Sequence, residues 1–131
     1  MRQLPIVFIN YSNSDFLKLA ILQARHFNPD CDIILLGDES NRDLKGICTH
    51  LLYKNFTDSS KKLESLYQHF STNSYEIELF CIKRWFILFE YMKANELEWV
   101  FTADSDVLLY SSINNYFNEN FQLYRFCISF C

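Results

Sequence analysis

Two short apolar segments separated by a helical pattern constrain the fold of this chain more than any other feature. Ile6–Ile9 and Asp32–Leu36 consist mostly of isoleucine, leucine and valine, and polar residues follow each of them. Such runs are typical of strands that are buried on both faces of a parallel sheet. Between them, Asp15–His26 carries apolar residues at helical spacing, and Ser14 is in place to cap its first turn. This order predicts an α/β fold with a Rossmann-like, mostly parallel sheet flanked by helices.

The rest of the chain continues the alternation of strands and helices. The further elements that we expect are strands over Ile47–Tyr53, Trp99–Thr102 and Phe121–Cys131, and helices over Lys61–Phe70, Tyr75–Asn95 and Ile113–Asn118. Ser111 or Ser112 is expected to cap the last of these helices. The helix over Tyr75–Asn95 is apolar around most of its circumference, so we expect it to be packed on most sides.

The composition fits one folded domain and excludes several classes of function. Of 131 residues, 50% are hydrophobic and 18% are aromatic, which suffices for one buried core. The formal net charge is −4 without a basic patch, so nucleic acid is not expected as a partner. The five cysteines have neither disulfide-framework nor zinc-site spacing, and we expect reduced thiols. Since no segment has the length of a membrane span, we expect a cytoplasmic protein, with peripheral attachment to a membrane left open.

The clearest candidates for chemistry are Asp104 and Asp106, which follow the strand expected at Trp99–Thr102. Side chains two residues apart in extended chain point to the same side, so a divalent cation would relieve the repulsion between these carboxylates. Mg²⁺ and Mn²⁺ favour oxygen ligands and bind through one or two carboxylates together with substrate phosphates. Ligands of parallel α/β sheets gather outside the carboxyl ends of the strands, where this triplet falls. The alternative is an ordinary turn, for which aspartate and serine are well suited.

The region around this triplet resembles glycosyltransferases of the GT-A fold. The matching stretch runs from Phe80 (Phe-Cys-Ile-Lys-Arg-Trp-Phe) to Asp104-Ser105-Asp106-Val107, and a looser match starts at Ile6. In that family an apolar helix and a hydrophobic strand precede an Asp-x-Asp motif. The resemblance therefore covers almost the whole chain, and its specific part is the motif.

The resemblance implies a metal-dependent glycosyltransferase with Mn²⁺ or Mg²⁺ as its cofactor. Such an enzyme transfers a sugar from a nucleoside-diphosphate sugar, here with a UDP-sugar favoured, to a hydroxyl of a carbohydrate or lipid-linked acceptor. By the same resemblance the metal bridges the two phosphates, and Asp106 is the firmer metal ligand. Asp104 contacts the ribose or the sugar, with or without touching the metal, and Ser105 belongs to the same nucleotide-sugar site.

In GT-A folds the base and ribose lie across the ends of the first strands, which directs attention to two loops. Asn10 offers a donor and an acceptor to a base edge, and Tyr11 offers a ring to stack on the base. Asp38 can accept hydrogen bonds from ribose hydroxyls or from the base. Ordinary loop chemistry is the alternative for all three residues.

Arg84 is a further candidate because its charge interrupts an apolar face of the long helix. A buried guanidinium needs a partner, since burying a charge alone is costly. A diphosphate would serve as this partner, and so would a structural carboxylate. Glu78 and the two aspartates of the triplet are the carboxylates that we consider.

The match leaves the acceptor site and the general base unassigned. In the family these generally follow the Asp-x-Asp strand, whereas only 25 residues follow Asp106 here, with Glu119 as their single acid. We expect residues 1–131 to form one nucleotide-sugar-binding domain that is incomplete at its C-terminus, with an apolar end that makes self-association plausible.

Two other interpretations stay open. The run Val-Phe-Thr-Ala-Asp-Ser-Asp-Val-Leu-Leu also resembles the first motif of haloacid-dehalogenase-like phosphohydrolases. There Asp104 would be a nucleophile and Asp106 an acid/base, although that motif normally opens its domain. The other interpretation is a non-catalytic or inactive fragment that binds a nucleotide sugar, or that binds nothing.

Overall fold

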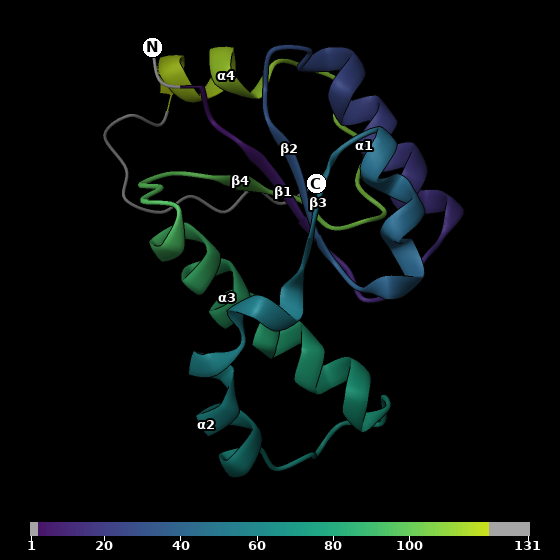
Figure 1. Ribbon diagram of the computed structural model, residues 1–131, viewed down its shortest axis with the longest axis vertical. Coiled ribbons are helices and arrows are strands. Elements are labelled where there is room, and N and C mark those ends of the chain that lie inside the picture. The colour runs from purple at the N-terminus through teal and green to yellow at the C-terminus, as the bar shows by residue number, and fades with distance from the viewer. Residues whose placement is uncertain (1–2, 121–131) are drawn as a thin grey trace.

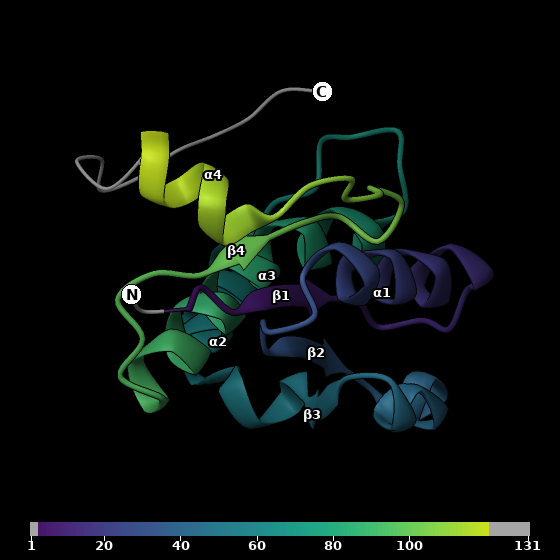
Figure 2. The ribbon, with the colours of Figure 1, turned by 90° about the horizontal axis from the view of Figure 1, so that it is seen from above.

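Four strands form one sheet in the computed structural model, which describes residues 3–120. The strands are β1 (Ile6–Ile9), β2 (Ile33–Gly37), β3 (Thr49–Leu52) and β4 (Phe101–Thr102). Every pairing is parallel, and the order is β3-β2-β1-β4, which Figure 2 shows from bottom to top. Together with the flanking helices, this sheet confirms the predicted α/β class. The GT-A type stays a prediction.

Helices cover both faces of the sheet. The described elements besides the strands are helices α1 (Asp15–Phe27), α2 (Asp58–Leu66), α3 (Tyr75–Ala94) and α4 (Ile113–Asn120), with 3₁₀ helices η1 (Glu39–Gly46) and η2 (Tyr53–Phe56). In Figure 1, α1 lies to the right of the strands and α3 runs below them, from the lower right to the left. Among residues 3–120, no helix is both long enough and apolar enough to cross a lipid bilayer.

The two central strands, β1 and β2, supply side chains to two separate cores, one on each face of the sheet. Ile6 and Phe8 of β1 pack with α1, whereas Val7 between them packs with α3. All three are fully buried. Successive side chains of a strand point to opposite faces, so a strand covered on both sides must be apolar throughout. This is why short unbroken apolar runs identified β1 and β2.

The first half of the fold follows the sequence prediction closely. β1 has the predicted bounds, β2 is displaced by one residue, and β3 lies within Ile47–Tyr53. The Ser14 hydroxyl accepts a hydrogen bond from the Leu17 amide at 3.2 Å and caps α1 as predicted. At the other end of the chain, Ser112 is the residue whose hydroxyl accepts from the Asn115 amide in the first turn of α4.

The prediction for the second helix is wrong at both ends. α2 begins at Asp58 rather than Lys61 because the amides of Asp58 and Ser59 donate to the Glu90 carboxylate of α3. A helix start satisfied from another element has no local signature. α2 ends before the predicted Phe70, and Tyr67 leaves it to pack its ring 5.5 Å from that of Tyr75.

The prediction that the long helix is packed on most sides is also wrong. α3 has the predicted start and ends one residue earlier, but only one stripe of it is buried, formed by Leu79, Ile87, Leu88 and Tyr91. Ile82, Trp85 and Phe89 are exposed, with half of Trp85 accessible to solvent. The sheet, η2 and α2 all contact α3, and among the described residues these contacts still leave Ile82, Trp85 and Phe89 uncovered.

Two strand predictions need separate comment. β4 is limited to Phe101 and Thr102, because only Ile6 and Val7 of β1 pair with it. The strand predicted over Phe121–Cys131 lies outside the described residues. Of the cysteines within residues 3–120, Cys31 and Cys48 are buried free thiols and Cys81 is an exposed one.

Candidate functional site

The sheet has a topological switch point between β1 and β4. From β1 the chain builds outward through β2 to β3, and it then returns to place β4 on the other side of β1. Ligands of open parallel sheets bind outside the carboxyl ends of the strands at such a point. The segments that leave there are the loop after β1, residues 10–14, and the segment after β4, residues 103–106.

An open pocket of about 350 Å³ lies at this switch point. Its walls come from the end of β1 with the following loop, from α3, and from the segment after β4. The lining residues are Ile9, Asn10, Tyr11, Ser12, Ser14, Phe16, Phe80, Arg84, Asp104, Ser105 and Asp106. Six of the seven candidates from the sequence therefore line one pocket, although up to 96 positions separate them along the chain.

Asp38 is the candidate that does not line this pocket. Its carboxylate caps η1, accepting hydrogen bonds from the Ser40 amide at 2.9 Å and the Ser40 hydroxyl at 2.6 Å. A short acidic side chain at a helix start commonly has this role. The carboxylate is thus engaged within its own loop, and its contact with a ribose or base stays a prediction.

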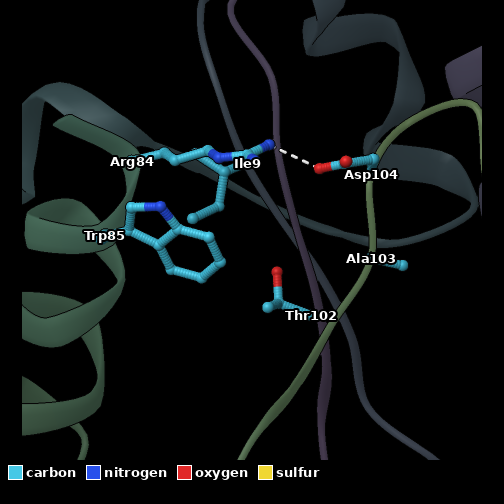
Figure 3. Close-up of a pocket in the computed structure, with 6 residues that line it drawn as sticks. All are labelled: Ile9, Arg84, Trp85, Thr102, Ala103 and Asp104. Carbon is cyan, nitrogen blue, oxygen red and sulfur yellow. Dashed lines mark hydrogen bonds and ion pairs between the residues drawn. The ribbon is translucent and has the colours of Figure 1, made fainter. Parts of the chain in front are cut away.

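The Asp104 carboxylate forms an ion pair with Arg84. Arg84 Nη1 lies 2.5 Å from Asp104 Oδ1, with the arginine side chain 28% exposed and the aspartate 57%. Figure 3 shows Arg84 reaching from α3, beside Trp85, toward Asp104. The guanidinium carbon lies 5.1 Å from the Trp85 ring centroid, a cation–π contact. Of the carboxylates considered from the sequence, the partner of Arg84 is Asp104.

Glu78, the other carboxylate considered, has partners of its own. It accepts hydrogen bonds from the Asn73 side-chain amide at 2.6 Å and the Ser71 hydroxyl at 2.9 Å. These bonds, that from Asn73 foremost, lower the pKa of Glu78. Glu78 therefore holds the loop before α3 rather than the arginine.

Arg84 also borders a second, small cavity of about 30 Å³, drawn in Figure 3. Thr102 and Ala103 line it together with the ion pair. Arg84 Nε is buried and has no hydrogen-bond partner among the described residues. A cavity of this size has room for a water molecule.

The triplet itself forms a turn, which corrects one assumption made from the sequence. The Val107 amide donates to the Asp104 carbonyl at 3.1 Å, so Ser105 and Asp106 are the central residues of a turn, not extended chain. The alternation of side chains along a strand does not apply there. Asp104 and Asp106 nevertheless line the same pocket, and both are exposed. A turn at Ser105 and Asp106 therefore still leaves both aspartates at one pocket.

The donor set fits one kind of metal site and not another. Residues 3–120 contain no group of three or more histidine, cysteine, aspartate or glutamate side chains arranged to hold a metal ion. Mg²⁺ usually binds through one or two carboxylates together with substrate phosphates. Asp104 and Asp106 therefore suit an ion that brings phosphate ligands with it, rather than a structural ion held by protein alone.

Known proteins do not supply a family for this site. No protein-family model, no curated protein and no solved structure matches the chain. The likeness to GT-A glycosyltransferases thus rests on the sequence motif alone. Function has to be argued from the pocket.

Aromatic packing holds the part of the pocket wall that Tyr11 and Phe80 form. The Tyr11 ring meets Phe80 of α3 edge-on, with 4.5 Å between centroids and 69° between planes. Phe80 in turn meets Tyr53 of η2 at 5.5 Å. Tyr11 remains 37% exposed, so part of its ring can still contact a ligand.

Asn10 has fewer free hydrogen-bonding groups for a ligand than the sequence suggested. Its side-chain oxygen accepts from the Ser12 amide at 2.8 Å and from the Ser12 hydroxyl at 3.0 Å. This Asx turn shapes the loop after β1 and engages the acceptor that was assigned to a base edge. The amide nitrogen of Asn10 is what it can present to a ligand.

Asn41 was missed by the sequence argument, although it contacts the loop after β1. It is fully buried, and its side-chain amide donates to the carbonyls of Asn10 and Ser12. The spacing Asp38-x-x-Asn41 is a variant of the capping box and predicts a helix start. Nothing in the local sequence indicates a contact 31 residues away.

Proposed function

We propose that this chain is the donor-binding half of a metal-dependent glycosyltransferase. The donor would be a nucleoside-diphosphate sugar, with UDP-sugars favoured, and the acceptor a hydroxyl of a carbohydrate or a lipid-linked molecule. The observation that carries the proposal is the meeting of Asp104 and Asp106 with Tyr11 and Arg84 in one open pocket at the switch point of a parallel sheet. Such a crevice is where parallel α/β proteins bind nucleotides.

The charges in the pocket support a ligand that carries both phosphate and metal. Asp106 is exposed and would be the firmer ligand of Mn²⁺ or Mg²⁺, while Asp104 shares its carboxylate with Arg84. When bound, the cation neutralises charge on the departing diphosphate. The planar guanidinium of Arg84 matches the oxygens of a phosphate group and can orient the diphosphate beside it.

The size and the aromatic wall of the pocket support a nucleotide rather than a small anion. A volume of about 350 Å³ lies near the lower end of the roughly 300–1,000 Å³ typical of ligand pockets. The exposed part of the Tyr11 ring offers a stacking surface for a base, held in place by Phe80. The proposal assigns no acceptor site and no general base.

Calorimetry with the wild-type chain and two matched variants tests this proposal. We expect UDP to bind with Mn²⁺ present and to lose binding when EDTA is added. We expect Asp106→Asn to weaken binding at least about tenfold, or ~1.4 kcal/mol. Asp30→Asn serves as the control, because Asp30 is also exposed but follows α1, away from the pocket. Neither substitution should change stability by more than about 0.5 kcal/mol, since both lie on the surface.

Three outcomes would contradict the proposal. A folded wild-type chain that binds neither UDP nor GDP in the presence of Mn²⁺ has no donor site. Equal binding by wild type and Asp106→Asn places the ligand elsewhere. Hydrolysis of p-nitrophenyl phosphate with Mg²⁺, lost in Asp104→Asn, would instead support the phosphohydrolase interpretation.

A further inference from the structure

The loop after β1 forms one wall of the pocket, and a single buried side chain holds it from within. Asn41, in η1, has no solvent exposure, which is unusual for asparagine. Its Nδ2 donates to the Asn10 carbonyl at 3.0 Å and to the Ser12 carbonyl at 3.1 Å. The two carbonyls flank Tyr11, so the backbone on both sides of Tyr11 is tied to the same amide group.

The oxygen of the same amide faces the opposite way and is equally occupied. Asn41 Oδ1 accepts from the Asp38 amide at 3.0 Å and from His50 Nε2 at 2.8 Å. A carboxamide has two N–H donors and two acceptor lone pairs, and here all four are used. Because the donors face carbonyls and the acceptor faces an amide N–H, the orientation of the side chain is defined by its partners.

His50 and Gly37 complete this arrangement. His50 Nε2 also lies 3.1 Å from the Asp38 carbonyl, so both of its partners are acceptors and Nε2 must carry the hydrogen. A Cβ at Gly37 would lie 2.1 Å from Asn41 Oδ1 and 2.7 Å from His50 Nε2. Only glycine at the end of β2 leaves room for this pair.

We infer that Asn41 is a positioning residue. It holds the loop after β1 so that the Tyr11 ring and the side-chain amide nitrogen of Asn10 face the ligand. His50 acts through Asn41 by fixing its orientation. Asn41 is fully buried and touches no ligand itself; its effect passes through the Asn10 and Ser12 carbonyls. The effect on ligand affinity rests on the proposed function, whereas the effect on the loop does not.

The chain contains a matched control for this inference in Asn28. It is 3% exposed, its Nδ2 donates to the Ala24 and Ser111 carbonyls at 3.2 Å each, and its Oδ1 accepts from the Ile113 amide at 2.7 Å. Asn28 is thus a buried, well-bonded asparagine that does not line the pocket. A purely structural role for Asn41 would give the two residues equivalent effects.

The test compares Asn41→Asp with Asn28→Asp, since aspartate keeps the shape and removes both donors. By NMR we expect the backbone order parameters of residues 10–12 to fall from about 0.85 toward 0.6 in Asn41→Asp only. With Mn²⁺ and UDP we expect about tenfold weaker binding for Asn41→Asp. For Asn28→Asp we expect UDP binding to weaken less than about twofold, because a substitution at a distant site with no shared partners acts independently of the pocket.

A milder pair of variants keeps the inference testable if Asn41→Asp does not fold. His50→Gln supplies an amide N–H in place of Nε2 and should retain the order of the loop, whereas His50→Leu should lose it. Equal loop order in wild type and both Asn41→Asp and His50→Leu would overturn the inference. Absent UDP binding in the wild type would count against the proposed function alone, because the NMR comparison is made without ligand.

Discussion

At the amino end of the sheet, asparagine side chains bond to backbone amides of neighbouring segments and leave that end covered by protein. At the carboxyl end, an asparagine holds a loop beside an open pocket. Asn114 of α4 accepts from the Leu4 amide at 2.7 Å, and Asn28 accepts from the Ile113 amide at 2.7 Å. Figure 1 shows α4 near the start of β1. At the carboxyl end, Asn41 uses the same hydrogen-bonding capacity on the loop after β1. Asparagines thus satisfy backbone groups at the amino end, whereas at the carboxyl end an asparagine positions a loop of the pocket.

The comparison indicates which end can take a ligand. Backbone groups at the amino end are satisfied by α4 and by the end of α1, so a ligand would have to displace protein contacts. At the carboxyl end, exposed carboxylates and the partly exposed Tyr11 ring line a pocket. The carboxyl end is therefore preorganised by buried groups while its exposed groups remain available.

The largest effect on this comparison is expected from Gly37→Ala. A Cβ there meets Asn41 Oδ1 at 2.1 Å, so the buried amide must move and its hydrogen bonds at the carboxyl end break. We expect a loss of about 3 kcal/mol in the free energy of unfolding, combining overpacking with unsatisfied polar groups. Urea unfolding followed by circular dichroism measures it.

Gly46→Ala is the matched control for that experiment. A Cβ at Gly46 meets nothing within 4 Å, and the residue has no positive φ. We expect no loss and a gain of up to about 1 kcal/mol, because alanine restricts the unfolded chain. Similar destabilisation by both substitutions would mean that crowding around Asn41 does not hold the carboxyl end.

A smaller effect is expected at the amino end from Asn114→Ala. This change removes the acceptor of the Leu4 amide and the 3.0 Å contact of Asn114 Nδ2 with Cys31 Sγ. We expect a loss of about 1–2 kcal/mol in stability. Cys31 is buried, so its alkylation requires this end to open; burial foremost, and then Asp30, also raises the pKa of its thiol.

Alkylation mapped by mass spectrometry measures that opening directly. In the wild type we expect Cys81 to react readily, since it is exposed, and Cys31 to react slowly. Asn114→Ala should speed the reaction of Cys31 without changing nucleotide affinity. Asn115→Ala, in the next and exposed position, controls for the higher helix propensity of alanine. Unchanged labelling of Cys31 would show that α4 does not close the amino end.

The smallest effect concerns Glu78, which belongs to neither end and holds the loop before α3. Hydrogen bonds from Asn73 and then Ser71 lower its pKa in the folded state. A lowered folded-state pKa contributes stability above the unfolded value of about 4.3, which is lost as the pH falls through the folded value. We expect Glu78→Gln to flatten the stability profile slightly below about pH 4.5 and to leave both ends of the sheet unchanged. Thermal unfolding of both proteins between pH 3 and 7 tests this, and parallel profiles would contradict it.

Local sequence patterns determined the α/β class, the bounds of β1, the start of α1, and the position of the Asp-x-Asp triplet after a strand. Each depends on residues close together in the chain, such as the apolar run Ile6–Ile9 or the serine before α1. Burial on both faces and capping leave signatures within a few positions. The same patterns gave no reason to extend α2 to Asp58, because the group that satisfies its first turn is on α3.

The tertiary structure alone decided which of these residues meet. In it, Arg84 pairs with Asp104 rather than with Glu78, and the Asp-x-Asp triplet forms a turn rather than extended chain. One side of α3 is exposed. The tertiary structure also brought Asn41 to the loop after β1 and left space for it beside Gly37. These outcomes follow from the strand order and from packing between elements far apart in the chain, which short-range periodicity does not encode.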